Sequence, residues 1–123
     1  MAKTVLVVDD SASVLMIMRV TLELNNFVME TAPDGSAALG KLQAGLLPDL
    51  IITDINMPKM DGFSLIEAIK AMPALKRVPV LTMTTESSPE RREKVRRLGA
   101  TGWIVKPITT EKLLSVLKKV LPE

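Results

Sequence analysis

Short apolar runs alternate with amphipathic segments along the chain, and this alternation constrains the fold more than any other feature. Residues 4–8 form a continuous run rich in β-branched side chains, as expected for a strand buried on both faces. Residues 49–53 and 78–83 have the same character, and residues 101–105 are a further candidate. Residues 28–32 alternate between apolar and polar side chains, which favours a strand at a sheet edge.

Helices are expected between these strands, at about residues 13–25, 36–44, 63–72, 89–98 and 110–121. Gly45 is a stop signal for the second helix. Ser88 and Pro89 predict an N-cap and a first helical position for the fourth, which ends at Gly99. Five strand–helix pairs predict an α/β fold, a five-stranded parallel sheet with five helices on both faces.

The length of 123 residues fits one domain. No repeat, low-complexity segment or linker interrupts the pattern, and the chain ends with its last helix. We therefore expect a single domain over residues 1–123 with no output domain. No apolar run approaches the ~20 residues that span a membrane, and the N-terminus lacks the pattern of a signal peptide. The cytoplasm is the expected location.

The chain contains no cysteine and no histidine. This composition excludes disulfides, thiolate nucleophiles, Ser-His pairs and most transition-metal sites. Oxygen ligands remain, and they favour hard cations such as Mg²⁺. A net charge of +2 and only three aromatic residues give no support for nucleic-acid binding.

Polar side chains follow four of the expected strands. Asp9 and Asp10 follow the first, Asp54 the third, Thr84 the fourth and Lys106 the fifth. Ligands of open α/β sheets bind outside the carboxyl ends of the strands, so we expect these groups to share one rim. Repulsion between the carboxylates is tolerated if Lys106 neutralises one charge and a divalent cation two more. A carboxylate can also attack phosphorus and form an aspartyl-phosphate.

In this order and at these strand ends, four segments resemble the receiver domains of two-component signalling, and most of all the free-standing CheY-like chemotaxis regulators. They are Val8-Asp9-Asp10-Ser11, the run from Asp54 to Gly62 (DINMPKMDG), Met83-Thr84-Thr85-Glu86 and Lys106-Pro107-Ile108. The likeness covers essentially the whole chain. It implies a flavodoxin-like, doubly wound sheet of order 2-1-3-4-5, and a cis peptide at Lys106–Pro107.

The resemblance implies that Asp54 accepts a phosphoryl group from the phosphohistidine of a histidine kinase. Asp9 and Asp10 would hold Mg²⁺ together with Asp54, and Asn56 would add its backbone carbonyl to the metal. Lys106 would contact a phosphoryl oxygen. The chain has no imidazole of its own, so the phosphoryl group must arrive from outside.

The same resemblance implies a switch. Thr84 would bond a phosphoryl oxygen and move, which frees space for Trp103 and changes partner binding on the face of the fourth helix, fifth strand and fifth helix. Asn56 and Glu86 would set the rate of self-dephosphorylation. The output partner would be a flagellar motor switch component or another signalling protein, with a separate phosphatase as a possible further partner. The chain would be a regulator and not an enzyme.

Several residues have simpler interpretations. Asp34-Gly35 and Asp61-Gly62 are interpreted as turns. Thr85 competes with Thr84 for the phosphoryl contact, and Trp103 is bulkier than the Tyr or Phe usual at its place. The basic run at residues 91–97 is either a solvated helix face or a docking patch for an acidic partner, for which Arg92 and Arg96 would be tested by charge reversal.

Two rival functions remain open. A haloacid-dehalogenase-like phosphatase also uses an aspartate nucleophile and Mg²⁺, but it needs a D-x-D spacing that Asp9-Asp10-Ser11 lacks. A phosphate-independent interaction module would be expected to lack an acidic, Thr or Lys position of the rim. All of these positions are present.

Overall fold

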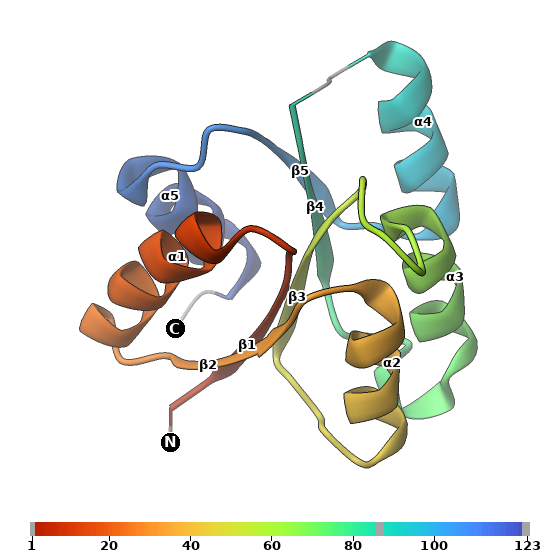
Figure 1. The fold of residues 1–123 in the computed structure, drawn as a ribbon, viewed down its shortest axis with the longest axis horizontal. Coiled ribbons are helices and arrows are strands. Elements are labelled where there is room, and N and C mark those ends of the chain that lie inside the picture. The colour runs from red at the N-terminus through yellow and green to blue at the C-terminus, as the bar shows by residue number, and fades with distance from the viewer. Residues whose placement is uncertain (1, 86–87, 122–123) are drawn as a thin grey trace.

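The computed structural model describes residues 2–85 and 88–121, in which five parallel strands alternate with five α-helices (Figure 1). The strands are β1 (Thr4–Val8), β2 (Val28–Ala32), β3 (Leu50–Asp54), β4 (Val80–Thr84) and β5 (Gly102–Val105). The helices are α1 (Ala12–Leu24), α2 (Gly35–Gln43), α3 (Gly62–Ala71), α4 (Pro89–Leu98) and α5 (Thr110–Val120). The strand order β2-β1-β3-β4-β5 confirms the expected fold class, and β2 and β5 are the edges.

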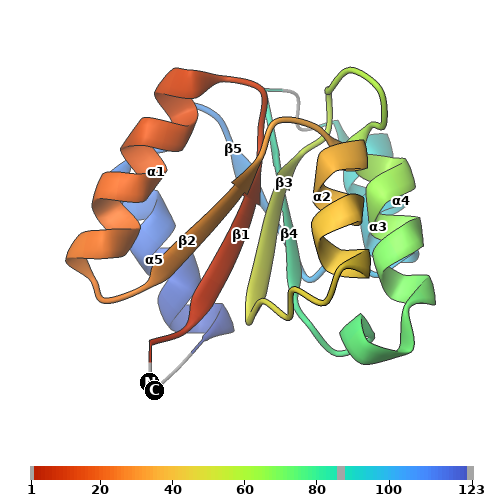
Figure 2. The same ribbon diagram turned by 60° about the horizontal axis from the view of Figure 1, so that its bottom comes forward.

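Helices cover both faces of the sheet, α1 and α5 on one side and α2, α3 and α4 on the other (Figure 2). Successive residues of β1 belong to opposite cores: Val5 and Val7 pack with α1 and α5, whereas Leu6 and Val8 pack with α2 and α3. All four side chains are fully buried. The continuous apolar run at residues 4–8 therefore reflects a strand with a core on each face.

Capping groups fix where the helices begin and end. Ser88 caps α4 through its side chain, and Gly99 follows with φ of 106°, as the sequence predicts. The interpretation of Asp34-Gly35 and Asp61-Gly62 as turns is wrong. The two aspartates are N-caps of α2 and α3 that accept backbone N–H groups of Ala37 and Ser64. A 3₁₀ turn that the sequence pattern does not predict, η1 (Pro73–Leu75), follows α3.

No helix among the described residues combines the length and apolarity needed to cross a membrane. The peptide bond between Lys106 and Pro107 is cis, as the resemblance implies. It turns the chain immediately after β5, at the same edge of the sheet where β1, β3 and β4 end.

Candidate functional site

The strand register brings the predicted site residues together. β1 and β3 pair Val8 with Thr53, so the next residues along the two strands are Asp9 and Asp54. β4 and β5 pair Thr84 with Val105, and Lys106 follows at once. Because the strands are parallel, these carboxyl ends form one rim.

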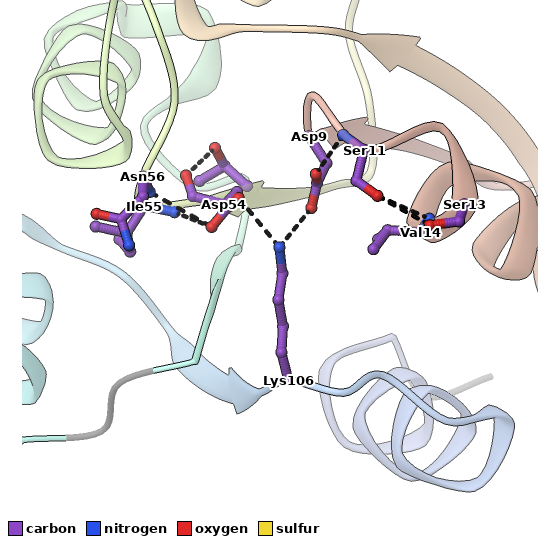
Figure 3. A network of polar contacts seen from close by, with 9 residues as sticks. Asp9, Ser11, Ser13, Val14, Asp54, Ile55, Asn56 and Lys106 are labelled. Carbon is purple, nitrogen blue, oxygen red and sulfur yellow. Dashed lines mark hydrogen bonds and ion pairs between the residues drawn. The ribbon is translucent and has the colours of Figure 1, made fainter.

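Lys106 lies between two carboxylates on this rim (Figure 3). Its Nζ atom is 3.0 Å from Asp9 Oδ2 and 3.1 Å from Asp54 Oδ2. The exposed fraction is 16% for the Lys106 side chain, 8% for Asp54 and 0% for Asp9. Lys106 therefore contacts two carboxylates, one more than the single charge that it was expected to neutralise.

Backbone N–H groups orient the other carboxylate oxygens. Asp54 Oδ1 accepts from Ile55 at 2.8 Å and from Asn56 at 3.4 Å, and Asp9 Oδ1 accepts from Ser11 at 2.8 Å. These donors are not predicted from the sequence, because a backbone amide leaves no signal in residue identity. The available signal was the aspartate itself, because Asp side chains commonly accept hydrogen bonds from backbone N–H groups close by in the chain.

Burial raises the pKa of the Asp9 carboxyl above its ordinary value of 3.8, and the charge of Asp54 acts in the same direction. The Ser11 amide and the Lys106 ammonium oppose this shift without cancelling it. Burial alone would lower the pKa of Lys106, but its contacts with Asp9 and Asp54 outweigh that effect and raise the pKa above 10.5. The rim is thus an acidic cluster that Lys106 only partly neutralises.

The donor atoms of this cluster fit a hard divalent cation. Asp9, Asp10 and Asp54 each place one carboxylate oxygen within 4.8 Å of the others. Asp9 Oδ2 is buried and forms no hydrogen bond within the described ranges, because its contact with Lys106 is an ion pair without hydrogen-bond geometry. Asp10 is exposed, which leaves room for the water ligands that Mg²⁺ keeps.

Of the remaining predicted residues, Thr84 ends β4 at this rim and Asn56 follows β3, whereas Trp103 lies near the opposite end of β5. Thr84 is fully buried at the end of β4, and its neighbour Thr85 is exposed. Asn56 is exposed in the loop after β3, and Trp103 is partly buried in β5. Glu86, expected to modulate dephosphorylation, lies outside the described residues.

Comparisons with known proteins agree with this geometry. The family model for the response regulator receiver domain matches residues 5–118. The chemotaxis response regulator CheY4 of Vibrio cholerae is 43% identical, with a TM-score of 0.93, over 98% of this chain and all of that structure. The receiver domain of the Pseudomonas aeruginosa sensor histidine kinase PA1611, whose structure holds a magnesium ion in its active-site cleft, has the same fold. It is 22% identical with a TM-score of 0.89, and each chain covers the other completely.

Among curated proteins, the transcriptional regulatory protein PrrA of Mycobacterium bovis is 38% identical over 117 residues, which is 95% of this chain. The match covers 49% of PrrA, so the chain spans about half the length of the curated relatives it matches. The family match covers nearly all of the sheet and all four strand ends that form the rim. The chain therefore belongs to the response regulator receiver domain family.

Proposed function

We propose that the chain is a phosphorylation-activated switch of a two-component pathway, with Asp54 as phosphoacceptor and a histidine kinase as donor. One observation carries the proposal: Lys106 lies 3.0 Å from Asp9 and 3.1 Å from Asp54 on a rim that also holds Asp10. The Asp54 carboxylate, the Lys106 ammonium and two further carboxylates thus lie around one point. It is the arrangement that phosphoryl transfer requires.

In the proposed reaction, a carboxylate oxygen of Asp54 forms a bond to phosphorus as the bond from phosphorus to the histidine nitrogen breaks. The departing imidazole keeps the electron pair of that bond and takes up a proton. Lys106 and the amides of Ile55 and Asn56 hold the Asp54 carboxylate in place before the attack. Lys106 then remains beside the new phosphoryl oxygens and stabilises their charge.

Asp9 and Asp10 would hold Mg²⁺, with Asp54 and the backbone carbonyl of Asn56 completing the protein ligands. When bound, the metal supplies positive charge that offsets the acidic cluster and the transferring phosphoryl group. The buried Asp9 Oδ2 atom, which lacks a hydrogen bond in the described part of the chain, supports this assignment.

The signal would then pass from Thr84 to Trp103 and to the face formed by α4, β5 and α5. Thr84 is better placed than Thr85 to contact a phosphoryl oxygen, because the Thr84 side chain is buried at the rim while Thr85 is exposed. The Trp103 indole N–H is buried and has no hydrogen-bond partner among the described residues. A buried unpaired donor costs ~1–3 kcal/mol, which favours an alternative ring position once space opens.

The likeness to CheY4 supports a role as a regulator in chemotaxis, acting in the cytoplasm on an output partner such as a flagellar motor switch component. Asn56 and Glu86 would set the rate of self-dephosphorylation, with a separate phosphatase as a possible further partner. The chain would act as a regulator, not as an enzyme with a diffusible substrate.

The basic run on α4, residues 91–97, gives only partial support for an output partner that binds there through acidic residues, because several of its arginines contact other residues of the domain. Arg96 forms a 2.8 Å ion pair with Glu93 of the same helix, and Arg97 lies 3.6 Å from the same carboxylate. The Arg92 guanidinium stacks 5.8 Å from the centre of the Trp103 ring. Charge reversal of Arg92 and Arg96 therefore disturbs contacts within the domain as well as a partner's approach.

Acetyl phosphate tests the phosphoacceptor assignment. With Mg²⁺ present, intact-mass spectrometry should show one phosphoryl adduct on the wild type and none on Asp54→Asn. The matched control is Asp61→Asn, since Asp61 caps α3 and is not one of the three clustered carboxylates, and asparagine caps equally well. The control should form the adduct as the wild type does, and EDTA should abolish it.

Two results would contradict the proposal. An adduct that persists in Asp54→Asn would place the acceptor elsewhere. Steady turnover of a free phosphomonoester such as p-nitrophenyl phosphate would instead indicate a phosphatase. Loss of the adduct in both asparagine variants would point to a general disturbance of the fold rather than to the acceptor.

A further inference from the structure

Lys112 links α5 to the segment that carries Lys106. It is the third residue of α5, and its Nζ atom donates to the carbonyl of Val105 at 3.1 Å and to the carbonyl of Pro107 at 3.1 Å. These carbonyls belong to the residues on either side of Lys106. One ammonium group therefore ties both neighbours of the rim lysine to a helix that packs on the sheet.

The backbone around Lys106 has support from the sheet on one side. The Lys106 N–H donates to the Thr84 carbonyl of β4 at 2.8 Å. On the other side β5 is an edge, and within residues 2–85 and 88–121 no strand pairs with it there. The next residue, Pro107, has no backbone N–H to donate. Lys112 therefore anchors the chain at the point where the sheet no longer does.

The helix by itself does not explain a lysine at this position. The N-terminal end of a helix carries partial positive charge, which disfavours a cation in the first turn. Thr109 caps α5 by accepting from the Lys112 backbone N–H at 3.1 Å, and the residue that completes such a capping box is Glu or Gln. In the described part of the chain no carboxylate pairs with the Lys112 ammonium, so the two carbonyls are the partners that account for it.

The proposed reaction depends on where the Lys106 ammonium lies. Its Nζ atom is 3.0 Å from Asp9 and 3.1 Å from Asp54. Figure 3 shows the Lys106 side chain reaching both carboxylates from the segment just after β5, so a shift of that backbone moves the ammonium group. A misplacement of ~1 Å in a group that takes part in a reaction can slow it by up to about a hundredfold.

We propose that Lys112 is a positioning residue for phosphoryl transfer. Its ammonium group holds the carbonyls on either side of Lys106 and so fixes Lys106 between Asp9 and Asp54. The inference rests on the proposed function, because it assigns Lys112 to the same reaction at Asp54. In this role Lys112 contacts neither the acceptor nor the phosphoryl group and acts only through Lys106.

Two other roles would also account for a lysine here. An exposed cation close to Lys106 can attract an anionic phosphoryl donor from a distance, and salt screens that effect. Alternatively, the two hydrogen bonds stabilise the start of α5 and have no effect on the reaction. The three roles predict different responses of the labelling rate to substitution and to salt.

The test compares Lys112→Met with Lys118→Met. Both lysines are exposed on α5, and methionine favours a helix but has no ammonium. With acetyl phosphate and Mg²⁺, the adduct on Lys112→Met should form about three- to tenfold more slowly than on the wild type, the loss expected for one or two hydrogen bonds. Lys118→Met should label at the wild-type rate. Lys112→Arg, which keeps a cationic donor, should recover most of the rate.

Salt and a second substitution separate the three roles. The loss in Lys112→Met should persist at about 1 M salt, where the Debye length is about 3 Å and attraction of the donor is screened. In a Lys106→Met background, Lys112→Met should slow labelling no further, because the residue that it positions is gone. A role in stability alone would lower the free energy of unfolding of Lys112→Met and leave its labelling rate unchanged.

Amide hydrogen exchange at Lys106 gives a readout that needs no phosphoryl donor. Its N–H donates to Thr84 and should exchange faster in Lys112→Met than in Lys118→Met. Unchanged exchange at Lys106, a wild-type labelling rate for Lys112→Met, a loss that salt removes, or an equal loss in the Lys106→Met background would overturn the inference. An adduct that persists in Asp54→Asn, or no adduct on the wild type, would instead contradict the proposed function. The exchange measurement then still decides whether Lys112 holds Lys106.

Discussion

Gly62 provides a sensitive test of how α3 supports the phosphoacceptor rim. It is buried at the start of α3, and its backbone N–H donates to the Ile55 carbonyl at 2.9 Å. A Cβ at this position would lie 2.5 Å from the Asp54 carbonyl oxygen and 2.8 Å from Ile55 Cα. Both neighbouring atoms belong to the backbone, so they cannot rotate away. Gly62→Ala must therefore push α3 away from the loop that carries Asp54.

The loss of stability expected for Gly62→Ala follows from overpacking. Inserting a methyl group against fixed atoms typically destabilises a protein by ~1–3 kcal/mol. Gly40→Ala is the matched control, because Gly40 is exposed within α2 and a Cβ there meets no atom within 4 Å. That variant should be more stable than the wild type by about 0.5–1 kcal/mol, since alanine favours the helix and restricts the unfolded chain. The two substitutions are chemically identical and are expected to have opposite signs.

Urea unfolding measures both free energies, and acetyl phosphate labelling measures the rim. Gly62→Ala should also label more slowly, by up to about a hundredfold, because a misplacement of ~1 Å in a reacting group can have an effect of that size. Gly40→Ala should label at the wild-type rate. If Gly62→Ala gains stability as Gly40→Ala does, the close packing of α3 on the Asp54 backbone is not a constraint, and the reasoning is wrong.

Three further predictions concern charge and backbone conformation. Lys106→Met leaves Asp9 and Asp54 without their shared cation, so in EDTA it should cost up to about 3–5 kcal/mol in urea unfolding, and Mg²⁺ should recover more stability than in the wild type. Unchanged stability would contradict the ion-pair argument. The pKa of Asp9 is higher in the folded protein than its ordinary value of 3.8. Its contribution to the free energy of unfolding is therefore fully present below pH 3.8, and it is lost as the pH rises through the folded-state pKa. The stability of the wild type relative to Asp9→Asn should therefore fall as the pH rises above 3.8 in metal-free buffer, and a rise over that range would show the sign to be wrong. Lys59 has φ of 67°, so Lys59→Gly should stabilise the domain by about 0.5–1 kcal/mol, while Lys76→Gly, at φ of −53°, should destabilise it.

The strands and the rim could be predicted from sequence because each rests on a strong local signal. The run at residues 4–8 has no polar side chain after Thr4, which only a strand covered on both faces explains well. Once the strands are placed in parallel, their carboxyl ends must meet. The approach of Asp9, Asp54 and Lys106 then follows from topology and not from any contact signal in the sequence.

The details that the sequence did not yield depend on backbone geometry. Asp34 and Asp61 were interpreted as turns because an Asp-Gly pair is common to turns and to helix starts. What decides between them is whether the following residues pack as a helix on the sheet. The amide donors of Ile55 and Ser11 were missed for a related reason, since any residue except proline supplies a backbone N–H.

The short length of β5 connects the proposed phosphoacceptor to the proposed partner face of α4, β5 and α5. Lys106 follows β5 directly, and its backbone N–H donates to the Thr84 carbonyl at 2.8 Å. Near the other end of the strand, the Trp103 ring lies 5.8 Å from the Arg92 guanidinium of α4. All four residues of β5 pair with β4, so we expect a shift of Thr84 or Lys106 on phosphorylation to reach Trp103 and α4. A partner that binds this face more tightly in the shifted state would then favour phosphorylation in return.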